Sequence, residues 1–201
     1  MVTFVFAVYF QQAVVGDTVR ATEMWGIALA ISALGVAILG PILGAAVDAG
    51  MQRKPWLLGA TVLMVLTCAG LWFATPDQDS IWLVLTLVAL GNFGFELGMV
   101  FYNAMLPVLA ERGRLGRVSG WAWALGYAGG LACLTVALFV LIRAEPPPFG
   151  LDLAAQEPVR AVALLVALWL ILFGWPLFVF TSENSGEALP VGAALREGIA
   201  A

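Results

Sequence analysis

Long stretches without a charged residue dominate this sequence. Six uncharged or nearly uncharged runs cover most of the chain: residues 1–16, 24–47, 55–76, 80–110, 118–142 and 161–182. A helix that crosses a bilayer needs about 20 apolar residues, and five of the six runs reach that length. Only 11% of the residues are charged, whereas a soluble domain usually carries about 25%. The sequence therefore predicts an all-α integral membrane protein, with a six-helix bundle over residues 1–182.

The two ends of the chain depart from this regular pattern. The first run would cover about 24 Å as a helix, which is less than the roughly 30 Å of a hydrocarbon core. We therefore expect the first helix to be truncated. Residues 183–201 begin with a polar stretch, and we expect them to form a cytoplasmic tail or the start of a central loop.

Several classes of chemistry are disfavoured by composition. The chain has no histidine, so it lacks the commonest general base and metal ligand. Cys68 and Cys133 lie far apart in apolar runs, and this placement favours packing over a disulfide or metal site. The net charge is −4 without a long basic cluster, which argues against nucleic-acid binding. We expect no enzyme activity, no metal and no cofactor.

The distribution of basic residues predicts the orientation in the membrane. Alternate connections carry six Lys or Arg on one side and three on the other, and the richer side is normally cytoplasmic. The richer side comprises Arg53, Lys54, Arg112, Arg114, Arg117 and Arg196. Both termini are therefore predicted to be cytoplasmic, in a membrane of the bacterial inner or plasma-membrane type.

The run over residues 80–110 carries a polar stripe on one face of the expected helix. At about 100° per residue, Asn92, Glu96 and Asn103 fall within about 40° of one another. Glycines line the opposite face and let a neighbouring helix approach closely; they are Gly91, Gly94 and Gly98.

Glu96 is the most unusual residue of this stripe, because it lies near the middle of an apolar run. A charge at the bilayer centre costs roughly 2.5–3.5 kcal/mol on insertion scales, and such residues face the bundle interior or water. No Lys or Arg of the chain falls at the same depth. Two interpretations follow: Glu96 ties helices together by hydrogen bonds, or it binds a proton or substrate with Asn92 and Asn103 beside it.

Small residues form two further stripes. The run over residues 24–47 contains Ala33, Ala37, Gly40 and Gly44, together with Pro41. The run over residues 118–142 contains Gly126, Tyr127, Ala128, Gly129 and Gly130. Close helix packing is the simple explanation for both stripes. The alternative is that smooth helices slide and tilt between two states, with Tyr127 either reaching a cavity or packing.

The junction between the second and third runs combines glycines with charges. Gly44, Asp48 and Gly50 precede the basic pair Arg53 and Lys54. An acid here can pair with basic neighbours or with the positive N-terminus of another helix. We interpret the junction as a gating latch, with an ordinary solvated turn as the alternative.

These strings resemble the major facilitator superfamily, and the vacuole-effluxer-like branch in particular. The junction is similar to the superfamily's loop 2–3 signature, although Ala49 stands where a basic residue is usual. The branch is indicated by Gly91-Asn92-Phe93-Gly94-Phe95-Glu96, by Val100 to Pro107 and by Trp123 to Gly130. The aromatic-Asp-Trp-Ala-Asn-Ser-like string that usually begins the family's first helix is absent.

The resemblance implies a transporter of twelve helices in two halves, of which this chain would supply the N-terminal half. It further implies efflux of small solutes, with amino acids as one option, by alternating access around a site between the halves. The implied partners are the lipid bilayer, a small-molecule substrate, and a second six-helix half or a second copy of the chain. The alternative is a membrane interaction protein, or an inactive remnant, that does not transport.

Overall fold

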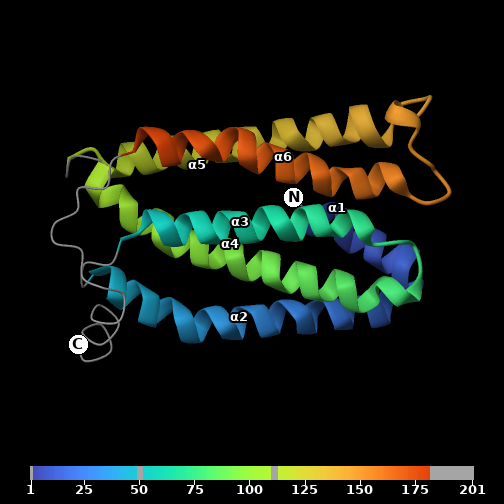
Figure 1. Ribbon diagram of the computed structural model, residues 1–201, viewed down its shortest axis with the longest axis horizontal. Helices are drawn as coiled ribbons and strands as arrows, with labels where there is room; N and C mark the ends of the chain where they lie inside the picture. The colour runs from blue at the N-terminus through green and yellow to red at the C-terminus, as the bar shows by residue number, and fades with distance from the viewer. Residues whose placement is uncertain (1, 49–51, 110–112, 182–201) are drawn as a thin grey trace.

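The computed structural model describes residues 2–48, 52–109 and 113–181, and these residues form helices that run side by side along the molecule (Figure 1). No strand occurs in these ranges, which confirms the predicted all-helical fold. The six helices are α1 (Val2–Tyr9), α2 (Thr18–Asp48), α3 (Lys54–Gly70), α4 (Ile81–Leu109), α5 (Leu115–Val136) and α6 (Glu157–Phe180). The predicted tail, residues 183–201, lies outside the described residues.

Short segments extend or join the main helices. Two π-helical segments continue α1 and α5: η1 (Phe10–Val15) and η4 (Ala137–Ile142). Three 3₁₀ turns lie in or beside the connections: η2 (Leu71–Phe73), η3 (Gln78–Ser80) and η5 (Pro148–Gly150). Segment η1 ends at Gly16, whose φ of 74° is a conformation that glycine adopts without steric cost.

Five helices in the described part of the chain are long and apolar enough to cross a membrane. They are the segments Thr18–Val47, Lys54–Phe73, Gln78–Pro107, Leu115–Ile142 and Glu157–Phe180. A shorter apolar helix covers Phe4–Val15. These lengths and compositions are those of a membrane protein with lipid around its apolar helices, and the bundle is compatible with half of a major-facilitator fold.

Four helices begin earlier than the uncharged runs, and α2 and α6 do so by the largest margins. Helix α2 starts at Thr18 rather than at residue 24, and α6 starts at Glu157 rather than at residue 161. A charge marks the edge of the hydrocarbon, but it does not end a helix. At the start of α2 the Asp17 carboxylate accepts hydrogen bonds from the backbone N–H groups of Val19 and Arg20, at 2.9 and 3.1 Å, so an acid begins this helix by capping it.

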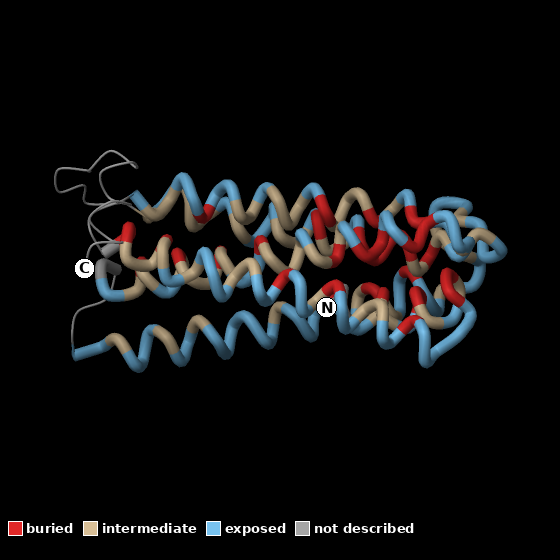
Figure 2. The backbone as a smooth tube through the Cα atoms, turned by 90° about the horizontal axis from the view of Figure 1, so that it is seen from below, coloured by how far each residue is buried: buried red, intermediate tan, exposed pale blue. Residues whose placement is uncertain are grey.

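The bundle has two distinct ends, which we name after the predicted orientation. The outer end holds the connections over residues 74–80 and 143–156, on the right of Figure 1. The inner end holds the end of α2, the start of α3 and the start of α5, on the left. Figure 2 shows that the buried segments gather toward the outer end.

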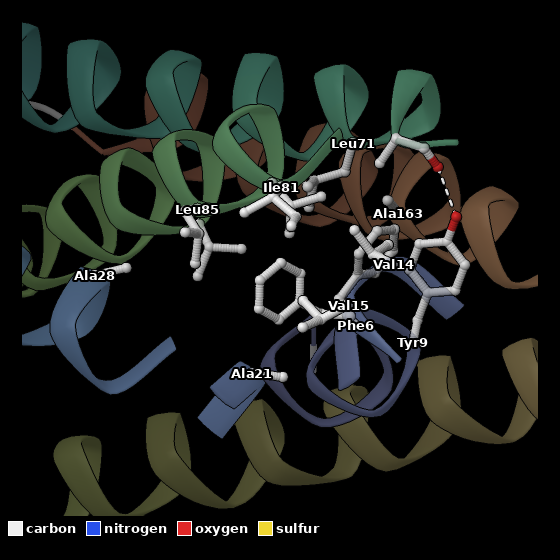
Figure 3. Close-up of a cluster of buried hydrophobic side chains, with 14 residues drawn as sticks. Phe6, Tyr9, Val14, Val15, Ala21, Ala28, Leu71, Ile81, Leu85 and Ala163 are labelled. Atoms are coloured by element: carbon white, nitrogen blue, oxygen red, sulfur yellow. Dashed lines mark hydrogen bonds between the residues drawn. The ribbon is translucent and has the colours of Figure 1, made fainter. Parts of the chain in front are cut away.

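The largest hydrophobic cluster lies at the outer end (Figure 3). Phe6 and Phe10 of the first helical segment are fully buried there, against Ile81 and Leu85 of α4 and Ala163 of α6. A smaller cluster at the inner end joins Val47, Leu57 and Phe101, from α2, α3 and α4.

Helix α4 is the centre of the packing. It contacts both α2 and α3 along much of its length, and α3 also packs against α6. Helix α5 stands apart, because no residue between 116 and 132 is buried within the described part of the chain. Its apolar surface is therefore available to lipid or to another protein element.

Candidate functional site

Glu96 lies near the middle of α4, 15 residues after Ile81 and 13 residues before Leu109. Its side chain is exposed on the surface of the bundle. Among the residues that the structure describes, none makes a hydrogen bond or an ion pair with its carboxyl group. The bundle thus presents an acid at the middle of a spanning helix, on a face that the described helices leave open.

Asn92 is held at the contact between two helices. Its side-chain amide donates a hydrogen bond to the hydroxyl of Ser32 in α2, at 3.1 Å, and Ser32 is only 4% exposed. One donor of this amide is therefore committed to joining α2 and α4.

Asn103 lies almost two turns from Glu96 toward the inner end, and its side chain is exposed. The polar stripe predicted from the sequence is therefore divided. Asn92 belongs to a helix contact, whereas Glu96 and Asn103 share the open surface of α4.

The glycine face of α4 packs closely against α3, as predicted. A Cβ atom built on Gly91 would lie 2.9 Å from the hydroxyl of Thr67, and one on Gly94 would lie 3.3 Å from the Ala60 carbonyl oxygen. Such short distances leave no room for a side chain. The glycines thus set the separation of α3 and α4.

The two other small-residue stripes have little against them in the described part of the chain. A Cβ on Gly40 would meet only Val36 of its own helix, at 3.9 Å. A Cβ atom built on Gly44, Gly126 or Gly130 would meet no atom of the described residues within 4 Å. Pro41 lies inside α2 and is exposed. A Cβ built on Gly129 would lie 4.0 Å from the Trp169 indole nitrogen, which is an ordinary contact. Both stripes remain open surfaces of the bundle.

Tyr127 of α5 projects from this open surface and is 68% exposed. Its ring lies 5.8 Å from the ring of Trp123, one turn earlier on the helix. The two aromatic side chains form an exposed pair in the middle part of α5.

The predicted latch falls partly outside the described residues. Asp48 ends α2, but its side chain lies outside them, as does the whole of Gly50. Arg53 precedes α3 and is half-buried. The link from Asp48 to the basic pair therefore stays a prediction.

Lys54 has partners that the sequence does not reveal. Its ammonium group donates hydrogen bonds to the backbone carbonyls of Phe178, at 2.9 Å, and Thr181. These carbonyls belong to the end of α6, so a residue predicted to gate the α2–α3 junction contacts the end of α6.

Arg160 occupies the corresponding place at the outer end. It is 7% exposed, and its guanidinium donates from Nε, at 2.8 Å, and from a terminal nitrogen to the carbonyl of Trp72. The same group lies 5.0 Å from the centre of the Trp72 ring. In the sequence, Arg160 does not stand out from the other basic residues near the ends of the apolar runs.

A family model described as vacuole effluxer Atg22 like matches residues 12–116, which is more than half of the chain. The chain belongs to the Atg22-like vacuole effluxer family.

A curated relative is an uncharacterized MFS-type transporter, YxiO, of Bacillus subtilis strain 168. It is 30% identical over 182 residues, which cover 87% of this chain and 41% of the relative. The chain therefore spans less than half the length of this relative. No solved structure matches the chain.

The part of this Atg22-like chain that matches the family model includes the centre of the packing. Residues 12–116 contain the whole of α2, α3 and α4. Glu96, the Ser32–Asn92 contact and Lys54 all fall inside the match, whereas Tyr127 and Arg160 lie beyond it. The matched segment thus carries the acid and its supporting glycine face.

Proposed function

We propose that this Atg22-like protein works in secondary active transport, exporting small solutes by alternating access. Its family and its MFS-type relative support transport in general. The observation that carries the finer proposal is the exposed carboxyl group of Glu96 at the middle of α4. Intramembrane acids are expensive to insert, and they mark ion, proton or substrate pathways. Transport, rather than catalysis on a bound substrate, is the activity that such a group serves here.

Glu96 would bind either the coupling proton or the amine group of a substrate such as an amino acid. A carboxylate attracts a cationic amine, and a carboxylic acid can carry a proton across the membrane centre. Asn103, on the same open surface, would add a hydrogen bond to the substrate. Because Asn92 already bonds to Ser32, its proposed role is to position α4 instead.

A second six-helix element would complete the pathway. In secondary transporters the substrate site lies between two repeats near the midplane. The open small-residue stripes of α2 and α5 suit a partner that packs closely, either a second half or a second copy of this chain. In this proposal both termini face the cytoplasm of a bacterial-type inner membrane, and the α2–α3 junction acts as the inner gate.

The test uses the complete transporting assembly in liposomes, with radiolabelled amino acids as probes. Glu96→Gln keeps the shape of the side chain but cannot carry a negative charge. If Glu96 couples protons, flux driven by a pH gradient falls at least tenfold, while exchange of labelled for unlabelled amino acid continues. If Glu96 binds the substrate amine, both activities fall.

The matched control is Glu23→Gln, which removes an exposed acid at the outer part of α2. It should retain driven flux and exchange. Unchanged driven flux in Glu96→Gln would eliminate the role of this acid. An assembly that folds and binds its partner but transports none of the probes would favour the interaction-protein alternative.

A further inference from the structure

Helices α3 and α6 cap each other, each at one end of the pair. A cation from the first turn of each helix binds backbone carbonyls at the end of the other. We propose that Lys54 and Arg160 are positioning residues that lock α3 and α6 into one rigid pair, which moves as a single body. This inference goes beyond the proposed transport function and can be tested without transport.

The inner cap joins the start of α3 to the end of α6. Lys54 is the first residue of α3, and its ammonium group reaches the carbonyls of Phe178 and Thr181. Leu57 is buried in the same region, in a cluster that includes Leu177 and Phe178. The charge contact is thus backed by apolar packing between the same two helices.

The outer cap joins the start of α6 to the end of the segment that continues α3. Arg160 is the fourth residue of α6, and it binds the carbonyl of Trp72 at the end of the segment that continues α3. Its third nitrogen donates to the Ala155 carbonyl at 3.4 Å. Trp72 also packs against the cluster that contains Ala161 and Val162.

Helix electrostatics explain why the cations serve the neighbouring helix. The last carbonyls of a helix have no partner within the helix, and they carry the negative end of its dipole. A cation in the first turn of a helix opposes the positive end of its own dipole. Lys54 and Arg160 are therefore not stabilised by the dipoles of their own helices, and the carbonyls of the other helix give each cation a favourable contact.

The geometry fixes the register of the pair as well as its spacing. The segment Lys54–Phe73 has 20 residues and spans about 30 Å at 1.5 Å per residue. The two caps therefore lie at opposite ends of a membrane-length contact. A shift of α6 along α3 by one turn, about 5.4 Å, would break both caps at once.

The test measures distances by electron paramagnetic resonance in the purified chain, after Cys68 and Cys133 have been replaced by Ala. One pair of spin labels, at positions 58 and 179, reports on the inner ends of α3 and α6. A second pair, at positions 73 and 164, reports on the outer ends. All four positions are exposed, so the labels do not disturb the core.

Removal of one cap should loosen only its own end. Lys54→Met keeps the aliphatic stem but loses the ammonium group, and we expect the inner distance distribution to widen at least twofold while the outer one stays narrow. Arg160→Met should give the reverse pattern. Lys54→Arg should restore a narrow inner distribution. The matched controls are Arg117→Met and Arg143→Met, which remove exposed cations near the inner and outer ends.

Narrow distributions at both ends in both Met variants would overturn the proposal. So would equal widening at both ends in either variant, because that result indicates general loosening of the bundle. If a Met variant does not fold, the variant that keeps the charge at the same position, Lys54→Arg or Arg160→Lys, replaces it in the test. This variant must fold and give a narrow distance distribution at its own end. A wide distribution there would contradict the proposal. Loss of flux in the Glu96 variant would affect none of these distances, so the two proposals fail separately.

Discussion

The hydrogen bond between Asn92 and Ser32 is the clearest polar contact between helices at membrane depth. Polar contacts between membrane helices are worth about 0.6 kcal/mol on average and at most about 1.7 kcal/mol in double-mutant cycles. We expect Asn92→Ala and Ser32→Ala each to destabilise the bundle. The double variant should lose less stability than the sum of the two single losses, and the difference should fall within this range of coupling energies. Reversible unfolding in mixed micelles measures it. Fully additive losses would mean that the contact contributes nothing.

Asp77 gives the outer end a pH dependence. Hydrogen bonding from the Thr75 side chain, followed by contacts with Ser80, holds the pKa of the Asp77 carboxyl below its usual range. A depressed folded-state pKa stabilises the fold above the unfolded value of roughly 3.9, and this contribution is lost as the pH falls through the folded value. The resonance of the Ser80 amide, which donates to Asp77 at 3.2 Å, should therefore follow the ionisation of this carboxyl, with a midpoint below that of an ordinary aspartate.

Nuclear magnetic resonance of the Ser80 amide in micelles measures that midpoint. Asp77→Asn removes the titrating group, so the Ser80 signal should become independent of pH over the same range. The exposed carboxyl of Asp152, in another outer connection, provides a comparison: Asp152→Asn should leave the Ser80 titration unchanged. A midpoint at or above the ordinary aspartate value would contradict the assignment.

Individual residues were predictable from sequence to different degrees. Glu96 could be found because a charge within a 31-residue apolar run is visible in the sequence. The partners of Lys54 and Arg160 could not be found, because they are backbone carbonyls 124, 127 and 88 residues away. A carbonyl is present at every residue, so no residue pattern distinguishes the one that is used.

At the scale of helices, α4 is organised by its two faces. The glycine face approaches α3 so closely that a side chain on Gly94 would press on a backbone oxygen of Ala60. Overpacking of this kind typically costs 1–3 kcal/mol. We expect Gly94→Leu to lower stability by roughly this amount, and thermal denaturation in detergent measures the change.

The control for this prediction is Gly120→Leu in α5, where an added Cβ would meet nothing within 4 Å. In the isolated chain this variant should fold as well as the parent. Equal losses in the two variants would show that helix flexibility, rather than the contact with α3, decides the effect. If Gly120→Leu destabilises the assembled transporter but not the isolated chain, a partner covers α5 in the assembly.

The helices themselves were largely predictable, because each uncharged run contains one. The sequence did not predict which small-residue face packs against another helix of the chain. The spacings around Gly94, Gly40 and Gly126 all favour close contact, yet of these three glycines Gly94 alone meets another described helix at short distance. Spacing along one helix defines a smooth face, but it does not identify the helix that covers it.

For the whole molecule, orientation is the property that a simple experiment decides. A single cysteine at position 52, in the α2–α3 connection, should react with a membrane-impermeant maleimide only from the cytoplasmic side. A single cysteine at position 149, which is 90% exposed in the 143–156 connection, should react only from outside. Both measurements use the chain with Cys68 and Cys133 replaced, and the opposite pattern would invert the predicted orientation.

The reciprocal caps also determine how the protein meets membranes of different thickness. Two helices that only pack through apolar side chains can slip past each other when the lipid around them becomes thicker or thinner. Helices α3 and α6 are held at both ends by Lys54 and Arg160, so the pair keeps a constant length. We therefore expect the pair to accommodate mismatch by tilting together, so that a change in lipid thickness becomes a rotation shared by both helices.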